Sequence, residues 1–330
     1  MFNNKKILIT GGTGSFGKAF VSMLVKKYKN IKKLIIFSRD EYKQYEMQLT
    51  FSREKYKFLR YFLGDVRDKD RLNFAFRDVD YIIHAAALKQ VNTAEYNPFE
   101  FINTNILGAK NVIEASINCG VEKVIALSTD KACSPINLYG ATKLCSDKLF
   151  CSANNIVGSK IETKFSVVRY GNVFASRGSI IPLFYSQNEK GLKFTITDME
   201  MTRFNIFMDQ AVEVVEWSLS NMKGSEIIVP KLKSFKIIDL IKSINPKPKI
   251  KIIGIRPGEK IHEELISESD SRLTIYVGKY YIILPSKNFF LKYKYKKIPK
   301  KFIYRSDLNK DLLKIKEVKK LLLSSKNYSK

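Results

Sequence analysis

Apolar runs and helix-like segments alternate along the first half of the chain. Apolar residues recur at helical spacing over residues 16–28 and 99–119, and a polar helix is predicted over 41–52. Short apolar runs typical of buried strands occupy residues 5–10, 32–38, 58–65, 80–86 and 122–128. Because strands and helices alternate, the pattern predicts right-handed crossovers and a doubly wound parallel α/β sheet covered on both faces.

The pattern changes after about residue 172, where strands become scattered and prolines interrupt the chain. We therefore predict a first domain over 1–172 and a smaller mixed α/β lobe over 173–286. A lysine-rich extension over 287–330 follows, with a helix around 308–323.

Composition excludes several classes of protein. The chain has 330 residues, of which 45% are hydrophobic and 27% charged, so wholesale disorder is excluded. Two histidines and four cysteines without a CxxC pair argue against a metal site and for a reducing, cytoplasmic setting. The N-terminus does not look like a signal peptide, and no apolar run approaches the roughly 20 residues of a membrane span.

The net charge is +26, and 16 Lys and Arg residues against three acidic ones lie within residues 279–330. Such charge attracts nucleic acid and other anions. No zinc-finger or RNP-like signature accompanies it, so no specific nucleic-acid partner is predicted.

A glycine-rich turn follows the first predicted strand and opens the first helix. Gly11 permits a tight turn, Gly14 lets a pyrophosphate approach the backbone, and Gly17 lets helix and strand pack closely. The free N–H groups of the helix would face the phosphates. This placement predicts a Rossmann-type dinucleotide site whose first loop contributes Thr10, Gly11, Thr13, Gly14, Ser15, Phe16 and Gly17.

The second strand ends at Ser38 and Arg39, with Lys43 one helical turn beyond. Cations at this position suit the 2′-phosphate of NADP better than the ribose hydroxyl of NAD, although both could be ordinary surface charges. Asp65 follows the third strand and would lie near the adenine amino group, or would instead cap the next helix. NADP is therefore the predicted cofactor.

Two short motifs carry candidate chemistry. Tyr139 and Lys143 form a YxxxK pair on one face of a helix, where an ammonium beside the phenol would lower the pKa of the tyrosine. The preceding strand ends in Thr129, Asp130 and Lys131. An acid and a base side by side at the carboxyl edge of the sheet suit elimination of water, whereas the alternative is a surface turn.

These motifs together resemble the extended short-chain dehydrogenase/reductases. Longer blocks resemble one family within them, the inverting UDP-N-acetylglucosamine 4,6-dehydratases of pseudaminic acid and related bacterial sugar pathways. The resemblance covers about residues 3–285 and includes TGGTGSFG (10–17), FSRDEYKQYEM (37–47), ALSTDKACSPINLYGATK (126–143), VVRYGNVFASRGSIIPLF (167–184) and IIGIRPGEKIHEELI (252–266). It implies a UDP-sugar substrate, NADP and a homo-oligomer, with a hexamer as the candidate size. Tyr139 in place of the Met of some capsule-pathway relatives favours the pseudaminic branch.

The resemblance also implies roles for the motif residues. Tyr139 would take the proton of the 4-hydroxyl, Lys131 would remove the proton on carbon 5, and Asp130 would protonate the departing 6-hydroxyl. Thr129 would hydrogen-bond the sugar or Tyr139, and Lys143 would hold the nicotinamide ribose. Adjacent groups can share protons, so the division between Asp130 and Lys131 stays open.

The other predicted contacts lie in the matching blocks. Those to the cofactor are Val66, Ala85, Ala86 and Lys89. Those to the substrate are Lys89, Thr129, Lys131, Asn172, Arg177, Arg256 and Glu259, several of which could be ordinary salt-bridged or solvated residues. His262 and Glu263 could be packing at the edge of the core. Asn92 and Asn205 depart from the family pattern, which has a proline and an aromatic residue there.

The predicted function is therefore a UDP-N-acetylglucosamine 4,6-dehydratase that inverts carbon 5. A nucleotide-sugar 4-epimerase is the alternative enzyme, since it needs the Tyr139–Lys143 pair but not Asp130 and Lys131. A basic NADP-binding regulatory or RNA-binding protein without turnover is the non-enzymatic alternative.

Overall fold

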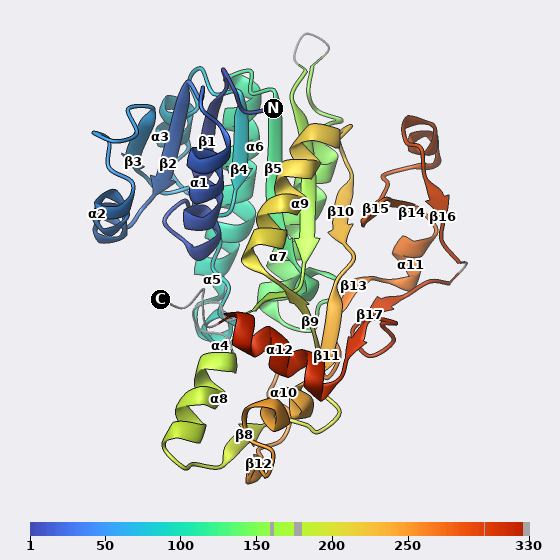
Figure 1. The fold of residues 1–330 in the computed structure, drawn as a ribbon. Helices are drawn as coiled ribbons and strands as arrows, with labels where there is room; N and C mark the ends of the chain where they lie inside the picture. The colour runs from blue at the N-terminus through green and yellow to red at the C-terminus, as the bar shows by residue number, and fades with distance from the viewer. Residues whose placement is uncertain (159–161, 175–179, 300, 326–330) are drawn as a thin grey trace.

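The computed structural model of the protein describes residues 1–158, 162–174, 180–299 and 301–325. A central sheet carries the predicted strand–helix units (Figure 1). Its strand order is β16-β14-β15-β10-β6-β5-β4-β1-β2-β3. The five strands predicted from apolar runs are β1 (Lys6–Thr10), β2 (Lys33–Ser38), β3 (Leu59–Leu63), β4 (Tyr81–His84) and β5 (Lys123–Thr129).

The strands of the sheet pair in parallel over most of its width and become antiparallel near one edge. From β3 to β10 (Ile227–Pro230), through β6 (Lys164–Tyr170), neighbouring strands run parallel. The three edge strands are antiparallel: β15 (Tyr280–Ile283), β14 (Thr274–Val277) and β16 (Lys296–Lys297). The sequence assigns β1 to β6 to one domain and β10, β14 and β15 to another, but all of these strands share one sheet. The domain division at residue 172 stays a prediction.

Helices cover both faces of the sheet, because its apolar strands must be buried on both sides. Helices α1 (Ser15–Lys27) and α9 (Met208–Asn221) contact each other on one face (Figure 1). On the other face lie α3 (Lys69–Ala75), α6 (Gly108–Asn118) and α7 (Leu138–Ala153). The short helix α2 (Glu41–Thr50) follows β2. The prediction of a doubly wound α/β fold is confirmed.

The helix predicted over 99–119 is not one regular helix. It consists of α5 (Pro98–Phe101), a π-helical segment η1 (Ile102–Leu107) and α6, after α4 (Val91–Tyr96). The π segment places the buried amide of Asn105 against both the N–H and the carbonyl of Leu88, at 2.9 and 3.0 Å. The same amide lies 3.1 Å from the hydroxyl of Thr142 on α7. A local irregularity thus ties the segment after β4 to α7.

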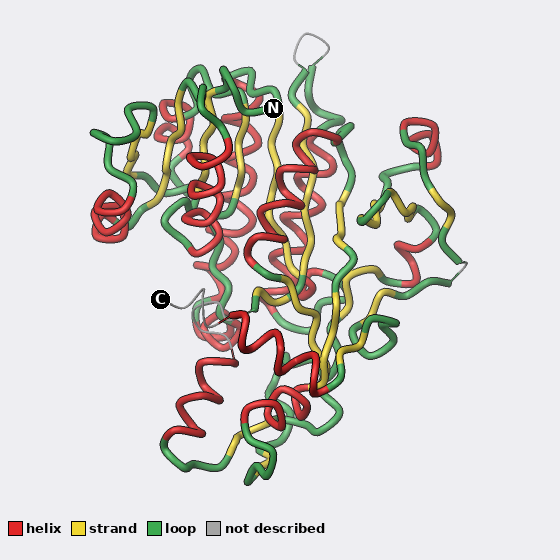
Figure 2. Tube along the Cα trace, viewed as in Figure 1, coloured by secondary structure: helices red, strands yellow, loops and turns green. Residues whose placement is uncertain are grey.

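A smaller lobe lies below the carboxyl ends of the parallel strands (Figures 1 and 2). Its four-stranded sheet has the order β18-β11-β9-β7, with β7 (Asn172–Val173), β9 (Thr202–Ile206), β11 (Lys233–Lys236) and β18 (Leu312–Leu313). Two further strand pairs are β8 (Phe194–Ile196) with β12 (Ile250–Ile252), and β13 (Glu264–Ile266) with β17 (Tyr304–Arg305). Helices α8 (Ile180–Glu189) and α10 (Ile237–Ile244) belong to this lobe. Elsewhere in the chain lie α11 (Glu268–Ser271) and two 3₁₀ turns, η2 (Asp130–Ala132) directly after β5 and η3 (Lys287–Lys292).

The lysine-rich extension is built into both parts of the protein. It supplies β16 to the central sheet, β17 and β18 to the lobe, and α12 (Ile315–Ser325), which packs on α10. The predicted helix start near residue 308 was wrong, because Leu312 and Leu313 pair with β11 as a strand. Val318 and Leu322 of α12 are buried in the apolar core of the lobe.

Candidate active site

A cleft of about 1600 Å³ separates the carboxyl edge of the sheet from the lobe. The glycine-rich turn and the ends of β2, β4 and β5 line one side of the cleft, and β9 and the segment 253–260 line the other. Ligands of doubly wound sheets bind at this edge. The fold therefore brings the predicted cofactor and catalytic motifs to one cavity.

The glycine-rich turn has the close backbone packing that its sequence predicts. A Cβ on Gly11, whose φ is +65°, would lie 2.8 Å from the backbone nitrogen of Ala86. A Cβ on Gly17 would lie 2.2 Å from the carbonyl oxygen of Gly12. Helix α1 has neither a side-chain cap nor an acidic residue in its first turn, so its N-terminal N–H groups are left for an anion. The turn thus fits a dinucleotide pyrophosphate.

The residues predicted to select NADP lie at the far end of the same cleft. Arg39 is 55% exposed, and its guanidinium lies 3.8 Å from Asp65. Lys43 pairs with Asp40 at 2.6 Å. Burial alone would raise the pKa of Asp65, but hydrogen bonds and charge from Arg67 hold that pKa below its ordinary value. Asp65 does not cap α3, because Asp68 fills that position.

The strand β5 and the turn η2 bring an acid and a base together. The carboxyl of Asp130 is fully buried and accepts hydrogen bonds from Thr129 and from the ammonium of Lys131, each at 3.0 Å. Lys131 also lies 3.4 Å from the amide oxygen of Asn172 and 3.2 Å from the carboxylate of Glu263. The segment Thr129–Lys131 is therefore not a solvated surface turn.

Tyr139 and Lys143 lie on the first two turns of α7, and the phenol of Tyr139 lies near Lys131 and Thr129. Burial raises the pKa of Tyr139 to about 12, while the charge of Lys131 and a hydrogen bond with Thr129 oppose that rise. The sequence predicts that Lys143 lowers the pKa of Tyr139, and this prediction is wrong: that pKa is raised, and the ammonium of Lys143 donates instead to the carbonyl of Leu127 at 2.8 Å. Burial lowers the pKa of Lys143. Lys131, rather than Lys143, is thus the cation whose charge partly offsets the rise in the pKa of Tyr139.

Two charged residues of the cleft were missed as functional candidates. Glu263 is 2% exposed and lies against Lys131 and, at 3.7 Å, the guanidinium of Arg203. Arg203 in turn lies 3.7 Å from Glu259. Burial would raise the pKa of Glu263, but Lys131 and Arg203 hold it below its ordinary value, so Glu263 is a carboxylate. The signal in the sequence was the position of Glu263 within the conspicuous RPGEKIHEELI block.

The other predicted substrate residues occupy the walls of the cleft. Lys89, Asn172, Arg256 and Glu259 all line it, and Arg256 is exposed. Glu259 also accepts a hydrogen bond from Thr197 at 3.0 Å. Arg177 lies outside the described residues. The two positions that depart from the family pattern, Asn92 and Asn205, both line the cleft.

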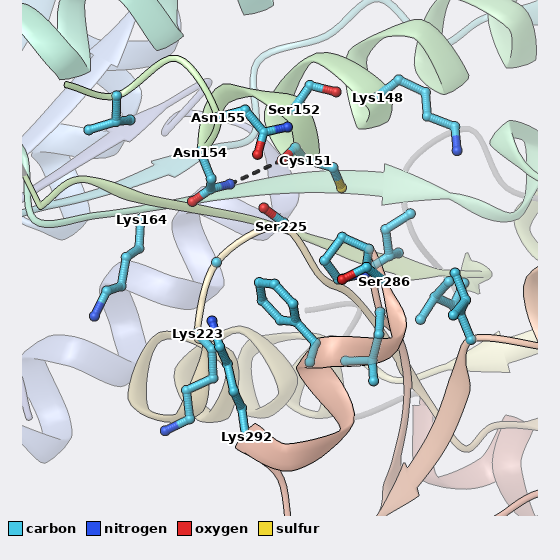
Figure 3. Close-up of a pocket in the computed structure, with 18 of the residues that line it drawn as sticks. Lys148, Cys151, Ser152, Asn154, Asn155, Lys164, Lys223, Ser225, Ser286 and Lys292 are labelled. Carbon is cyan, nitrogen blue, oxygen red and sulfur yellow. Dashed lines mark hydrogen bonds between the residues drawn. The ribbon is translucent and has the colours of Figure 1, made fainter. Parts of the chain in front are cut away.

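A second cavity, of about 890 Å³, lies at the amino end of β6, away from these motifs (Figure 3). Among the residues that the structure describes, four lysines line it, namely Lys148, Lys164, Lys223 and Lys292. The cysteine that faces it, Cys151, is held as a thiol because burial raises its pKa. None of the predicted catalytic residues lines this cavity, so the first cleft is the candidate active site.

The sheet, the glycine-rich turn and the Tyr139–Lys143 helix define a Rossmann-fold protein of the short-chain dehydrogenase/reductase type. Residues 7–285 match the sequence model of the polysaccharide biosynthesis protein family, and the chain belongs to that family. Within the described residues, no helix is long and apolar enough to cross a membrane.

Similar proteins agree on nucleotide-sugar chemistry but differ in the reaction that they are named for. A Campylobacter jejuni protein named UDP-N-acetylglucosamine 4,6-dehydratase (inverting) is 54% identical over 88% of this chain and 85% of its own length. A Rickettsia akari protein named UDP-glucose 4-epimerase is 45% identical over 98% of this chain and 97% of its own. The solved structure of Pen from Bacillus thuringiensis superposes with a TM-score of 0.88 at 39% identity, covering 98% of this chain and 99% of that one.

Proposed function

We propose that the protein is a UDP-N-acetylglucosamine 4,6-dehydratase that inverts carbon 5. The observation that carries this proposal is the ion pair between Lys131, which lines the same cleft as Tyr139, and the fully buried Asp130. An acid and a base at this place suit the removal of water across carbons 5 and 6. Two Campylobacter jejuni proteins named as inverting dehydratases are 54% and 55% identical to this chain, which supports the same choice.

NADP is the cofactor that we propose. The glycine-rich turn fits its pyrophosphate, and Arg39 and Lys43 lie where its 2′-phosphate would bind. When bound, it would accept hydride from carbon 4 and return hydride to carbon 6. Lys143, Ala85, Ala86 and Val66 all line the cleft at the positions predicted for contacts with it.

The residues of the chain would divide the proton transfers between them. Tyr139, aligned by its hydrogen bond with Thr129, takes the proton of the 4-hydroxyl. Lys131 first passes its own proton across 3.0 Å to Asp130, which leaves a neutral amine beside a protonated acid. The amine then removes the proton on carbon 5, and Asp130 protonates the departing 6-hydroxyl.

Substrate binding would use the walls of the cleft. Arg256, together with Arg177, would bind the pyrophosphate of the UDP-sugar, and Glu259 the uridine ribose. Lys89 and Asn172 would contact the sugar or nicotinamide. We further propose that the protein works as a homo-oligomer in the cytoplasm, a setting in keeping with its four unpaired cysteines.

A 4-epimerase is the second candidate, because relatives with that name match nearly the whole chain, including the C-terminal extension. Proton NMR of the product in heavy water separates the two reactions. A dehydratase yields a 6-deoxy-4-keto sugar nucleotide with deuterium at carbon 5, whereas an epimerase leaves the 6-hydroxyl intact. UDP-N-acetylglucosamine and UDP-glucose should each be supplied to the protein in this experiment.

Replacing Lys131 tests the same point. Lys131→Met should abolish formation of the 6-deoxy product, because the base that removes the proton on carbon 5 is gone. Lys148→Met is the matched control: Lys148 lies on α7 and lines the second cavity, so this variant should retain turnover. Full activity in Lys131→Met would rule out the proposed elimination and favour epimerisation.

A further inference from the structure

Glu263 is a buried charge that the proton transfers above do not use. Its backbone is fixed from the C-terminal extension: its N–H donates to the hydroxyl of Ser306 at 2.9 Å, and its carbonyl accepts from the N–H of Ser306 at 2.8 Å. The hydroxyl of Ser306, which is fully buried, lies 2.6 Å from that of Thr202. Glu263 is therefore held rigidly by a segment far away in sequence.

The side chain of Glu263 points at the acid–base pair. One carboxylate oxygen, Oε1, lies 3.2 Å from the ammonium of Lys131 and 3.7 Å from the guanidinium of Arg203. The other oxygen, Oε2, is buried and has no hydrogen-bond partner among the residues that the structure describes. The same is true of Oδ2 of Asp130. Two carboxylates thus share the Lys131 ammonium, and each has a second oxygen that is buried without a hydrogen-bond partner among the described residues.

Three cations, each from a different segment of the chain, surround Glu263. Arg203 reaches it from β9, Lys260 from the segment before β13, and Lys131 from η2. Arg203 is shared with Glu259, at 3.7 Å. These cations keep Glu263 ionised, so it places a permanent negative charge beside the Asp130–Lys131 pair.

A negative charge at this distance favours the protonated forms of both members of the pair. Burial raises the pKa of Asp130, the charge of Lys131 opposes that rise, and the charge of Glu263 adds to it. Burial would lower the pKa of Lys131, but Asp130 and Glu263 together raise it above its ordinary value. Both shifts retain protons on the pair.

We propose that Glu263 is a positioning residue for the elimination, whose carboxylate retains one proton on the Asp130–Lys131 pair over the working pH range. This inference rests on the proposed function. The elimination needs that one proton: as neutral amine and protonated acid, the pair takes a proton from carbon 5 onto Lys131 and gives one from Asp130 to the leaving oxygen. Water departs, a carbon–carbon double bond forms between carbons 5 and 6, and the pair is left as Lys131 ammonium and Asp130 carboxylate.

The pH dependence of elimination tests this role. Glu263→Gln removes the charge but keeps the size of the side chain, and we expect both limbs of the bell-shaped profile of kcat to move to lower pH by about 1–3 units. Glu263→Asp keeps the charge, so its limbs should stay near those of the wild type even if its rate falls. A loss of rate in Glu263→Gln with both limbs unmoved would mean a purely structural role and would overturn the proposal.

The neighbouring residue supplies a matched control. Glu264 is the first residue of β13 and directly follows Glu263, but it hydrogen-bonds Ser134, and Lys131 is not among the charges that shift its pKa most. Glu264→Gln removes an equal charge from the next position, and it should leave both limbs in place. An equal shift in both variants would show that the effect is one of net charge, against the proposal.

A measurement without substrate keeps this inference separate from the proposed function. Acetylation of Lys131 by acetic anhydride, followed by mass spectrometry across pH, reports the fraction of neutral amine in the folded protein. Glu263→Gln should reach half-maximal labelling about 1–3 pH units below the wild type; equal curves would reject the role of Glu263. The NMR product of the wild-type enzyme tests the proposed function by itself.

Discussion

Gly140 lies where the helix that carries Tyr139 touches the turn that carries Lys131. A Cβ at this position would lie 2.3 Å from the carbonyl oxygen of Lys131 and 3.1 Å from the ring of Pro135. An ordinary carbon–oxygen contact is about 3.3 Å, so Gly140→Ala must move helix and turn apart by about 1 Å. The substitution therefore perturbs the spacing between the proposed base and the phenol without removing either group.

The sign of the change in the free energy of unfolding distinguishes the effect of tertiary packing from that of helix propensity. In an exposed helix, Gly→Ala stabilises by about 0.5–1 kcal/mol. Here the clash should dominate, and the free energy of unfolding should fall by about 1–3 kcal/mol. A displacement of about 1 Å between reacting groups should also lower kcat by about 10²-fold.

Urea denaturation and steady-state turnover measure the two effects. Gly158→Ala is the matched control, because no described residue beyond its chain neighbours lies within 4 Å of a Cβ at that position. It should keep the stability and kcat of the wild type. A Gly140→Ala variant at least as stable as the wild type, with the same rate of turnover, would show that the Lys131 turn is not packed against α7.

Three further predictions follow from the fold and the cofactor site. Arg39→Ala should weaken NADP binding about tenfold or more, measured by fluorescence titration, and change NAD binding little; equal losses would reject the role of Arg39 in binding the 2′-phosphate. The ring of His84 is buried and lies 2.8 Å from the hydroxyl of Thr10, and burial lowers the pKa of His84 from 6.5 to about 3. Between pH 6.5 and about 3 the unfolded state therefore binds one more proton than the folded state, so the free energy of unfolding decreases as the pH falls. His84→Asn should flatten this loss, by up to about 1.4 kcal/mol per pH unit in urea denaturation at pH 7 to 5; an unchanged slope contradicts it. Val318→Ala should lower the free energy of unfolding by about 1–3 kcal/mol while Lys319→Ala does not; equal stabilities would mean that α12 is not part of the core.

The strand–helix alternation of the first half follows from local patterns. Strands β1 to β5 are short apolar runs, and such runs are buried wherever a parallel sheet is covered on both faces. The helix break at η1 was not predicted, because the π segment is stabilised by contacts of Asn105 with Leu88 and Thr142 rather than by its own periodicity. The start of α12 was misplaced for a similar reason, since Leu312 and Leu313 are held as a strand by β11.

The candidate site likewise contains residues that the sequence predicted and residues that only the tertiary structure brought together. Motif spacing alone predicted the glycine-rich turn, the Asp130–Lys131 pair and the Tyr139–Lys143 helix, because each lies within a few consecutive residues whose geometry is set by one turn or helix. Only the tertiary structure placed Glu263 against Lys131, 132 residues away, and anchored it through Ser306 of the extension. No local period encodes such a contact: it exists because folding buries charges that must find partners wherever the chain brings them.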